Sequence, residues 1–87
     1  MTREEIRDAV LRILGGIAPE ADLATLPGDV AVRDALDIDS MDFLSFVTAL
    51  DHQLHVAIPE VDYAKLETLD GCIDYLAAAL AQPRPTP

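Results

Sequence analysis

The chain has 87 residues, of which 51% are apolar, and it carries 16 acidic against 6 basic side chains, for a formal net charge of −10. This length allows one small domain, and the apolar share is too high for an acidic disordered chain. The negative charge excludes nucleic acid and favours basic protein partners. The single cysteine excludes an internal disulfide, and neither a signal peptide nor a membrane span is visible. We expect a monomeric cytoplasmic domain.

The first helix is predicted by its capping residues and by apolar spacing. Thr2 is followed three residues later by Glu5, the pattern of a capping box. Apolar residues then recur at helical spacing until the pair Gly15-Gly16, which is typical of a helix end. We therefore expect a helix over residues 3–15.

Residues 17–39 lack a clear period and contain Pro19 and the turn-forming run Pro27-Gly28-Asp29. A single helical turn over residues 32–36 fits the pattern inside this connection. A connection of this length is unusual in a compact domain and often signals a functional loop.

The second half of the chain predicts three further helices. Residues 40–55 form the strongest helix pattern, Pro59 begins a short helix that ends near residue 66, and Thr68 caps the last helix. No strand pattern and no repeat is visible. The prediction is an all-α four-helix bundle over residues 1–81, with three main helices, one short helix and a long loop between the first two. Residues 82–87 are expected to form a disordered Pro-rich tail.

Ser40 lies where the long connection gives way to the strongest helix, directly behind Asp39. An aspartate in this position caps the helix, and the positive end of the helix dipole lies beside the serine hydroxyl. Such a position suits a phosphate ester. Asp-Ser pairs also occur at helix starts as plain caps, so this pattern alone leaves both interpretations open.

The helix over residues 40–55 divides into two faces at about 100° per residue. Met41, Leu44 and Thr48 lie on a flank beside Ser40. Exposed apolar clusters tend to mark contacts, so we interpret this flank as a docking strip, with packing of Leu44 against the preceding loop as the alternative. The opposite arc is the predicted core face: Phe43, Phe46, Val47, Leu50 and Leu54.

Several short motifs occur together and in order. They are Asp39-Ser40-Met41-Asp42 with its following helix, Ala49-Leu50-Asp51, Ile58-Pro59-Glu60 and Ile73-Asp74-Tyr75-Leu76. This combination, across residues 3–81, resembles the acyl carrier protein family. The resemblance implies a non-catalytic chain in which Ser40 carries 4′-phosphopantetheine, installed from coenzyme A by a phosphopantetheinyl transferase with magnesium. It also implies an arm whose thiol holds acyl groups as thioesters, and a role for Asp39 in positioning metal and phosphate.

The resemblance further implies partner enzymes with basic docking patches that meet acidic residues of the second helix. In this chain that helix keeps only Asp42 and Asp51 as acidic residues, which weakens steering towards fatty-acid synthase partners. This favours a specialised carrier, loaded by a dedicated acyl- or aminoacyl-activating ligase and serving polyketide, lipid or related biosynthesis, over the housekeeping fatty-acid carrier. The partner surface is predicted to comprise Met41, Asp42, Leu44, Thr48, Asp51 and Ile58.

Other interpretations have less support. A calcium loop from Asp37 lacks ligands at the required places, and His52 and His55 have no third ligand for a metal. Those histidines lie too far along the helix from Ser40 to activate it as a hydrolase nucleophile. Cys72 is interpreted as a core residue. The remaining rival is an unmodified acidic adaptor, in which Ser40 is only a helix cap.

Overall fold

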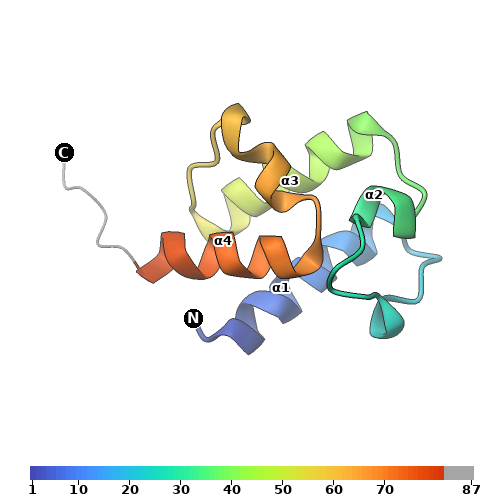
Figure 1. The fold of residues 1–87 in the computed structure, drawn as a ribbon, viewed down its shortest axis with the longest axis horizontal. Helices are drawn as coiled ribbons and strands as arrows, with labels where there is room; N and C mark the ends of the chain where they lie inside the picture. The colour runs from blue at the N-terminus through green and yellow to red at the C-terminus, as the bar shows by residue number, and fades with distance from the viewer. Residues whose placement is uncertain (82–87) are drawn as a thin grey trace.

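The computed structural model describes residues 1–81 (Figure 1). Its helices, in chain order, are α1 (Arg3–Ile17), η1 (Leu23–Thr25), α2 (Val32–Ala35), α3 (Ser40–Leu54), η2 (Glu60–Leu66) and α4 (Leu69–Ala81), where η marks a 3₁₀ helix. The all-α bundle with three main helices is confirmed. Within this described part the strand-like pairing is a single isolated bridge between Ala31 and Thr68. The predicted tail, residues 82–87, lies outside the described residues.

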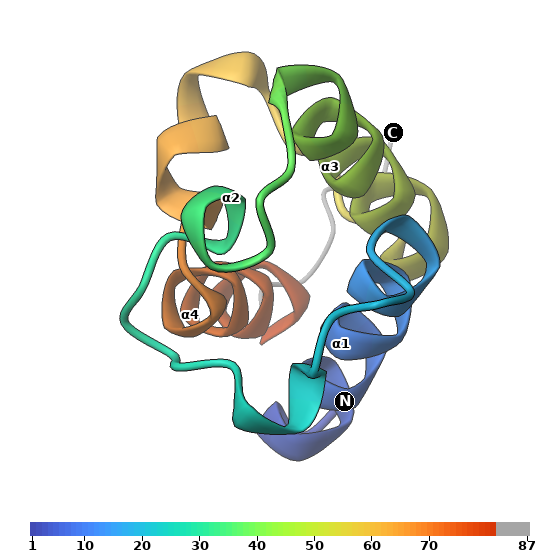
Figure 2. The ribbon, with the colours of Figure 1, turned by 90° about the vertical axis from the view of Figure 1, so that its right-hand side faces the viewer.

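The three long helices pack around one apolar core. Figure 1 shows that α3 and α4 run in the direction opposite to α1, and Figure 2 shows α2 beside the start of α4. Burial of apolar side chains between these helices is the main stabilising contribution. Among residues 1–81, no helix is long and apolar enough to cross a membrane. The fully buried large side chains include Ile6, Val10, Leu14, Val32, Phe46, Leu50, Leu66, Leu69 and Leu76.

The capping box that opens α1 is present as predicted. The Thr2 hydroxyl accepts a hydrogen bond from Glu5 N at 3.1 Å, and the Glu5 carboxylate accepts one from Thr2 N at 2.8 Å. Hydrogen bonding of the Glu5 carboxylate to Thr2, chiefly to its backbone N–H, lowers the pKa of Glu5 from its ordinary value. The helix continues to Ile17, two residues beyond the predicted end. The Gly15-Gly16 pair does not stop it because neither glycine adopts a positive φ, and Ile17 packs against the core.

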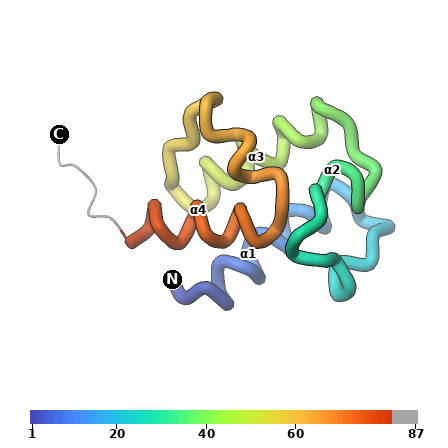
Figure 3. The backbone as a smooth tube through the Cα atoms, in the orientation of Figure 1, coloured from blue at the N-terminus to red at the C-terminus, as the bar shows by residue number. Residues whose placement is uncertain are grey.

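The connection from α1 to α3 is held in place more firmly than its sequence indicates. Figure 3 shows its path past the start of α4. Val32 N donates to Glu67 O at 2.7 Å, and Asp70 N donates to Gly28 O at 2.9 Å. A Cβ atom at Gly28 would collide with the Asp70 carboxylate, so a larger residue there would require the Asp70 side chain to move. Two backbone bonds therefore fix α2 against the beginning of α4.

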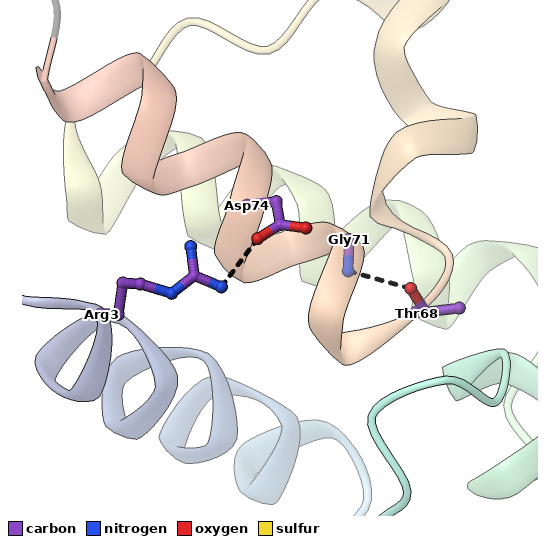
Figure 4. Close-up of polar contacts among 4 residues, drawn as sticks. All are labelled: Arg3, Thr68, Gly71 and Asp74. Carbon is purple, nitrogen blue, oxygen red and sulfur yellow. Dashed lines mark hydrogen bonds and ion pairs between the residues drawn. The ribbon is translucent and has the colours of Figure 1, made fainter.

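The beginning of α4 is capped by Thr68, as predicted. Its hydroxyl accepts a hydrogen bond from Gly71 N at 2.9 Å (Figure 4). A Cβ atom at Gly71 would lie 2.5 Å from Lys65 O, so a side chain cannot fit there without backbone movement. Further along α4, Asp74 pairs with Arg3 of α1 at 2.7 Å (Figure 4). This pair is exposed, so it contributes at most about 1 kcal/mol.

A second polar contact joins η2 to α4. The Tyr75 hydroxyl donates a hydrogen bond to Asp62 at 2.7 Å, and Lys65 lies 3.2 Å from the same carboxylate. These two partners lower the pKa of Asp62. Burial, together with the bond to Asp62, raises the pKa of Tyr75 to about 12. The short helix predicted after Pro59 is therefore present, as a 3₁₀ helix anchored to its neighbour through side chains.

Candidate functional site

Ser40 is the first residue of α3, and its side chain is exposed. Asp39 is the N-cap: its carboxylate accepts a hydrogen bond from Asp42 N at 2.8 Å, and its backbone carbonyl accepts one from Phe43 N at 3.0 Å. These bonds satisfy part of the N-terminal turn. The structure therefore places the Ser40 hydroxyl on a fixed backbone, open to an approaching molecule and beside the positive end of the helix dipole.

A basic side chain that the sequence analysis did not single out contacts this serine. Arg33, on α2, donates a hydrogen bond from Nη2 to Ser40 Oγ at 2.9 Å. Its guanidinium also lies over the ring of Phe43, with Cζ 5.9 Å from the ring centroid. Phe43 itself is 8% exposed and belongs to the core. The cation is thus held between a buried aromatic ring and the exposed serine oxygen.

The turn between α2 and α3 brings Arg33 to the serine. Asp37 adopts a left-handed conformation with φ of 52°, and Ile38 N donates to Arg33 O at 3.1 Å. Aspartate tolerates this region better than most residues. One signal in the sequence was available, because Arg33 is the only Lys or Arg between Arg12 and Lys65. The contact of Arg33 with Ser40 could not be predicted without knowing the path of the turn between α2 and α3.

Arg33 lies among acidic side chains. A hollow of about 410 Å³ next to Arg33 is lined by carboxylates and by Ala31 and Ile38. Its charged residues include Asp34, Asp37 and Glu67. Asp39 and Asp42 add further negative charge at the start of α3.

The predicted docking strip is exposed. Met41 is 71% exposed and Leu44 is 42% exposed, and they are two of the five large apolar side chains that are exposed among residues 1–81. Thr48 and Asp42 are exposed as well. Leu44 is therefore not buried against the preceding loop, which was the alternative interpretation.

The structure corrects the placement of one other predicted surface residue, Ile58. Ile58 is only 8% exposed and lies in the core, so its side chain does not belong to an exposed surface. The chain turns back after α3 at His55, whose φ is 54°, and Asp51 accepts a hydrogen bond from Ile58 N at 3.2 Å. The Asp51 carboxylate thus fixes this turn and is only partly exposed.

The other reactive side chains do not join the serine. His52 lies twelve residues along α3 from Ser40, about 18 Å at the helical rise per residue. Within the described residues no group of three potential metal ligands is present. Cys72 is fully buried, burial raises the pKa of its thiol to about 12, and its Sγ donates to Leu66 O at 3.1 Å. It is a core residue, as predicted, and is held in the unreactive protonated form.

The comparison with protein families identifies this type of domain. The family model described as "Phosphopantetheine attachment site" matches residues 4–76. An acyl carrier protein of Renibacterium salmoninarum is 31% identical over 83 residues, which cover 92% of this chain and 98% of the relative. One of Acidothermus cellulolyticus is 28% identical over 81 residues, covering 91% and 93%. The solved structure of the acyl carrier protein from Enterococcus faecalis has a TM-score of 0.77 at 26% identity and covers 91% of this chain and 99% of that one.

A helical bundle with an exposed serine at the start of a long helix is thus the fold of a phosphopantetheine-binding carrier domain. The chain belongs to the acyl carrier protein family. It is a carrier and not an enzyme, and it carries a covalently attached phosphopantetheine group. The residues present fit such a group, because an exposed hydroxyl and a guanidinium that suits a phosphate lie side by side at the helix start.

Proposed function

We propose that Ser40 is the attachment point of the phosphopantetheine arm. The observation that carries the proposal is the exposed Ser40 hydroxyl at the capped N-terminus of α3. Ser45, the other serine of the chain, lies one and a half turns further along α3, without the favourable helix end. Cys72 is buried and protonated, so it does not compete as a nucleophile.

During loading, Ser40 Oγ forms a bond to the phosphorus that bears pantetheine in coenzyme A. The bond from this phosphorus to the nucleotide part of coenzyme A breaks, and the serine proton leaves to a base. Among residues 1–81 the side chain that bonds to the Ser40 hydroxyl is Arg33, a cation that does not accept the proton, so a phosphopantetheinyl transferase supplies the base. The contribution of the chain is to hold the oxygen in a fixed, accessible position. When bound, the arm supplies a thiol that carries acyl groups as thioesters.

The direct test of this function is intact mass after incubation with coenzyme A, magnesium and a permissive phosphopantetheinyl transferase. We expect the whole population to gain the mass of one phosphopantetheine. A single addition is expected because one serine meets the structural conditions. An unchanged mass with several transferases would favour the rival function, an unmodified acidic adaptor in which Ser40 is only a helix cap.

We further propose that the carrier serves a specialised pathway, receiving its acyl or aminoacyl group from a dedicated activating ligase in the cytoplasm. Support comes from the exposed face of α3. Of its two acidic residues, Asp42 is exposed, whereas Asp51 is partly exposed and bonded to the backbone of Ile58. This face offers little negative charge to a strongly basic partner, and an apolar strip takes a larger share of the contact.

Leu44 is proposed as the centre of that contact surface, with Met41 and Thr48 beside it. Leu44→Glu is expected to raise the KM for this chain in phosphopantetheinyl transfer by about tenfold, because a charge replaces an exposed apolar contact. Its effect on stability is expected to stay within about 1 kcal/mol, as is usual for surface positions. Steady-state loading kinetics and urea unfolding measure the two effects.

Val30→Glu provides the matched control for this experiment. Val30 is 38% exposed, similar to Leu44, but it lies in the connection before α2. The control is expected to leave KM near the wild-type value. Two results would contradict a contact surface centred on Leu44. One is a loss of unfolding free energy in Leu44→Glu as large as the free energy that corresponds to its rise in KM. The other is an equal change of KM in both variants.

A further inference from the structure

We propose that Arg33 binds the phosphodiester formed at Ser40 and thereby fixes the direction in which the arm leaves the domain. This inference rests on the proposed attachment at Ser40. It adds a positioning residue that is not part of the serine motif and lies on a different helix, α2.

The geometry provides the first argument. Arg33 Nη2 lies 2.9 Å from Ser40 Oγ, the atom to which phosphorus becomes bonded. The non-bridging phosphate oxygens are then two bonds away from Oγ, within reach of the same guanidinium. An ester oxygen is a weaker acceptor than a charged phosphate oxygen, so the donor is expected to move from Oγ to the phosphate. The planar fork of arginine matches two phosphate oxygens at once.

The charges provide the second argument. A phosphodiester adds a negative charge to a segment that already contains Asp34, Asp37, Asp39 and Asp42. Without a nearby cation, these like charges oppose the modification. Among residues 1–81 the ion pairs are Arg3–Asp74 and Lys65–Asp62, so Arg33 forms no ion pair with a carboxylate.

Arg33 is held in position before the phosphate arrives. Its guanidinium lies over the Phe43 ring, and Phe43 is fixed in the core. The helix that carries Arg33 is fixed in turn by the bond from Val32 N to Glu67 O. A side chain that is already ordered loses less conformational freedom on binding than a free surface arginine does. The contact is therefore expected to persist in the loaded protein.

The test compares unloaded and fully loaded protein for the wild type, Arg33→Gln, Arg33→Lys and the control Arg7→Gln. Arg7 is exposed and lies in the first half of α1, the helix whose N-terminal end is at the end of the molecule opposite the start of α3 (Figure 1). The equilibrium constant for unfolding is measured in urea for the loaded and the unloaded form of each chain. The constant of the loaded form is then divided by that of the unloaded form, and this ratio is compared between the chains. A second readout is the ³¹P chemical shift of the loaded protein.

The ratio is expected to be about three- to fivefold higher in Arg33→Gln than in the wild type at low salt. The loaded form loses a contact between opposite charges, whereas the unloaded form loses only a hydrogen bond to a neutral hydroxyl. The difference should shrink at about 1 M ionic strength. Arg33→Lys should restore only part of the ratio, since lysine keeps the charge but lacks the planar fork. The ³¹P shift should change in Arg33→Gln and stay constant in Arg7→Gln.

Two failures can be told apart. If the wild-type chain gains no phosphopantetheine, the attachment at Ser40 is wrong and the role of Arg33 fails with it. If all chains load but the wild type and Arg33→Gln have equal ratios and equal ³¹P shifts, the role of Arg33 alone is wrong. Loss of loading in both Arg33 variants would place the arginine in the transferase contact and would also overturn the inference.

Discussion

Ser40→Ala is expected to abolish the mass gain completely, because the acceptor oxygen is removed and no other side chain can replace it. The fold should be retained, since Ser40 is exposed and the helix is capped by Asp39 rather than by the serine. The substitution also removes the hydrogen bond that Arg33 donates to the serine hydroxyl. Intact mass after transferase treatment and far-ultraviolet circular dichroism measure the loading and the fold.

Ser45→Ala is the matched control for this substitution. Both serines are exposed and both belong to α3, so the two variants differ mainly in their distance from the helix start. The control is expected to load like the wild type. A mass gain that persists in Ser40→Ala, or that disappears in Ser45→Ala, would move the attachment site away from residue 40.

Phe46→Ala is expected to lower the free energy of unfolding by about 3–5 kcal/mol. Phe46 is 0% exposed, and its ring centroid lies 6.1 Å from that of Phe43, which in turn supports Arg33. The substitution leaves a cavity on the core face of α3. Because small domains are only marginally stable, this loss is a large fraction of the total. Urea unfolding followed by circular dichroism measures it.

Leu44→Ala is the appropriate comparison for the core substitution. Leu44 lies on the same helix but is 42% exposed, so its truncation leaves little cavity. Its cost is expected to stay within about 1 kcal/mol. Similar losses for Phe46→Ala and Leu44→Ala would show that the two faces of α3 are not divided as the structure describes.

The helices and the exposed position of Ser40 at a helix start were predictable because the signals for them are local. The capping box at Thr2, the N-cap at Asp39 and the cap at Thr68 each depend on residues within three positions in the chain. The core face of α3 follows from the helical spacing of its apolar residues, and the buried residues of this helix agree with the prediction. The exposure of Leu44 follows from the same geometry.

The contacts that the sequence did not reveal depend on turns. Ile58 was predicted to lie on the surface, but the left-handed His55 and the bond to Asp51 direct it into the core. The contact of Arg33 with Ser40 depends in the same way on the left-handed Asp37. A positive φ at a residue other than glycine has no strong sequence signal, so the direction of the chain after it could not be derived.

The opposed directions of α1 and the two other long helices have a practical consequence. The N-terminus and the last turn of α4 lie at one end of the molecule, and the start of α3 lies at the other (Figure 1). A fused protein, an immobilising tag or a neighbouring module joined at either of these places would therefore point away from Ser40. Tethered preparations of this domain should consequently be modified as readily as the free one.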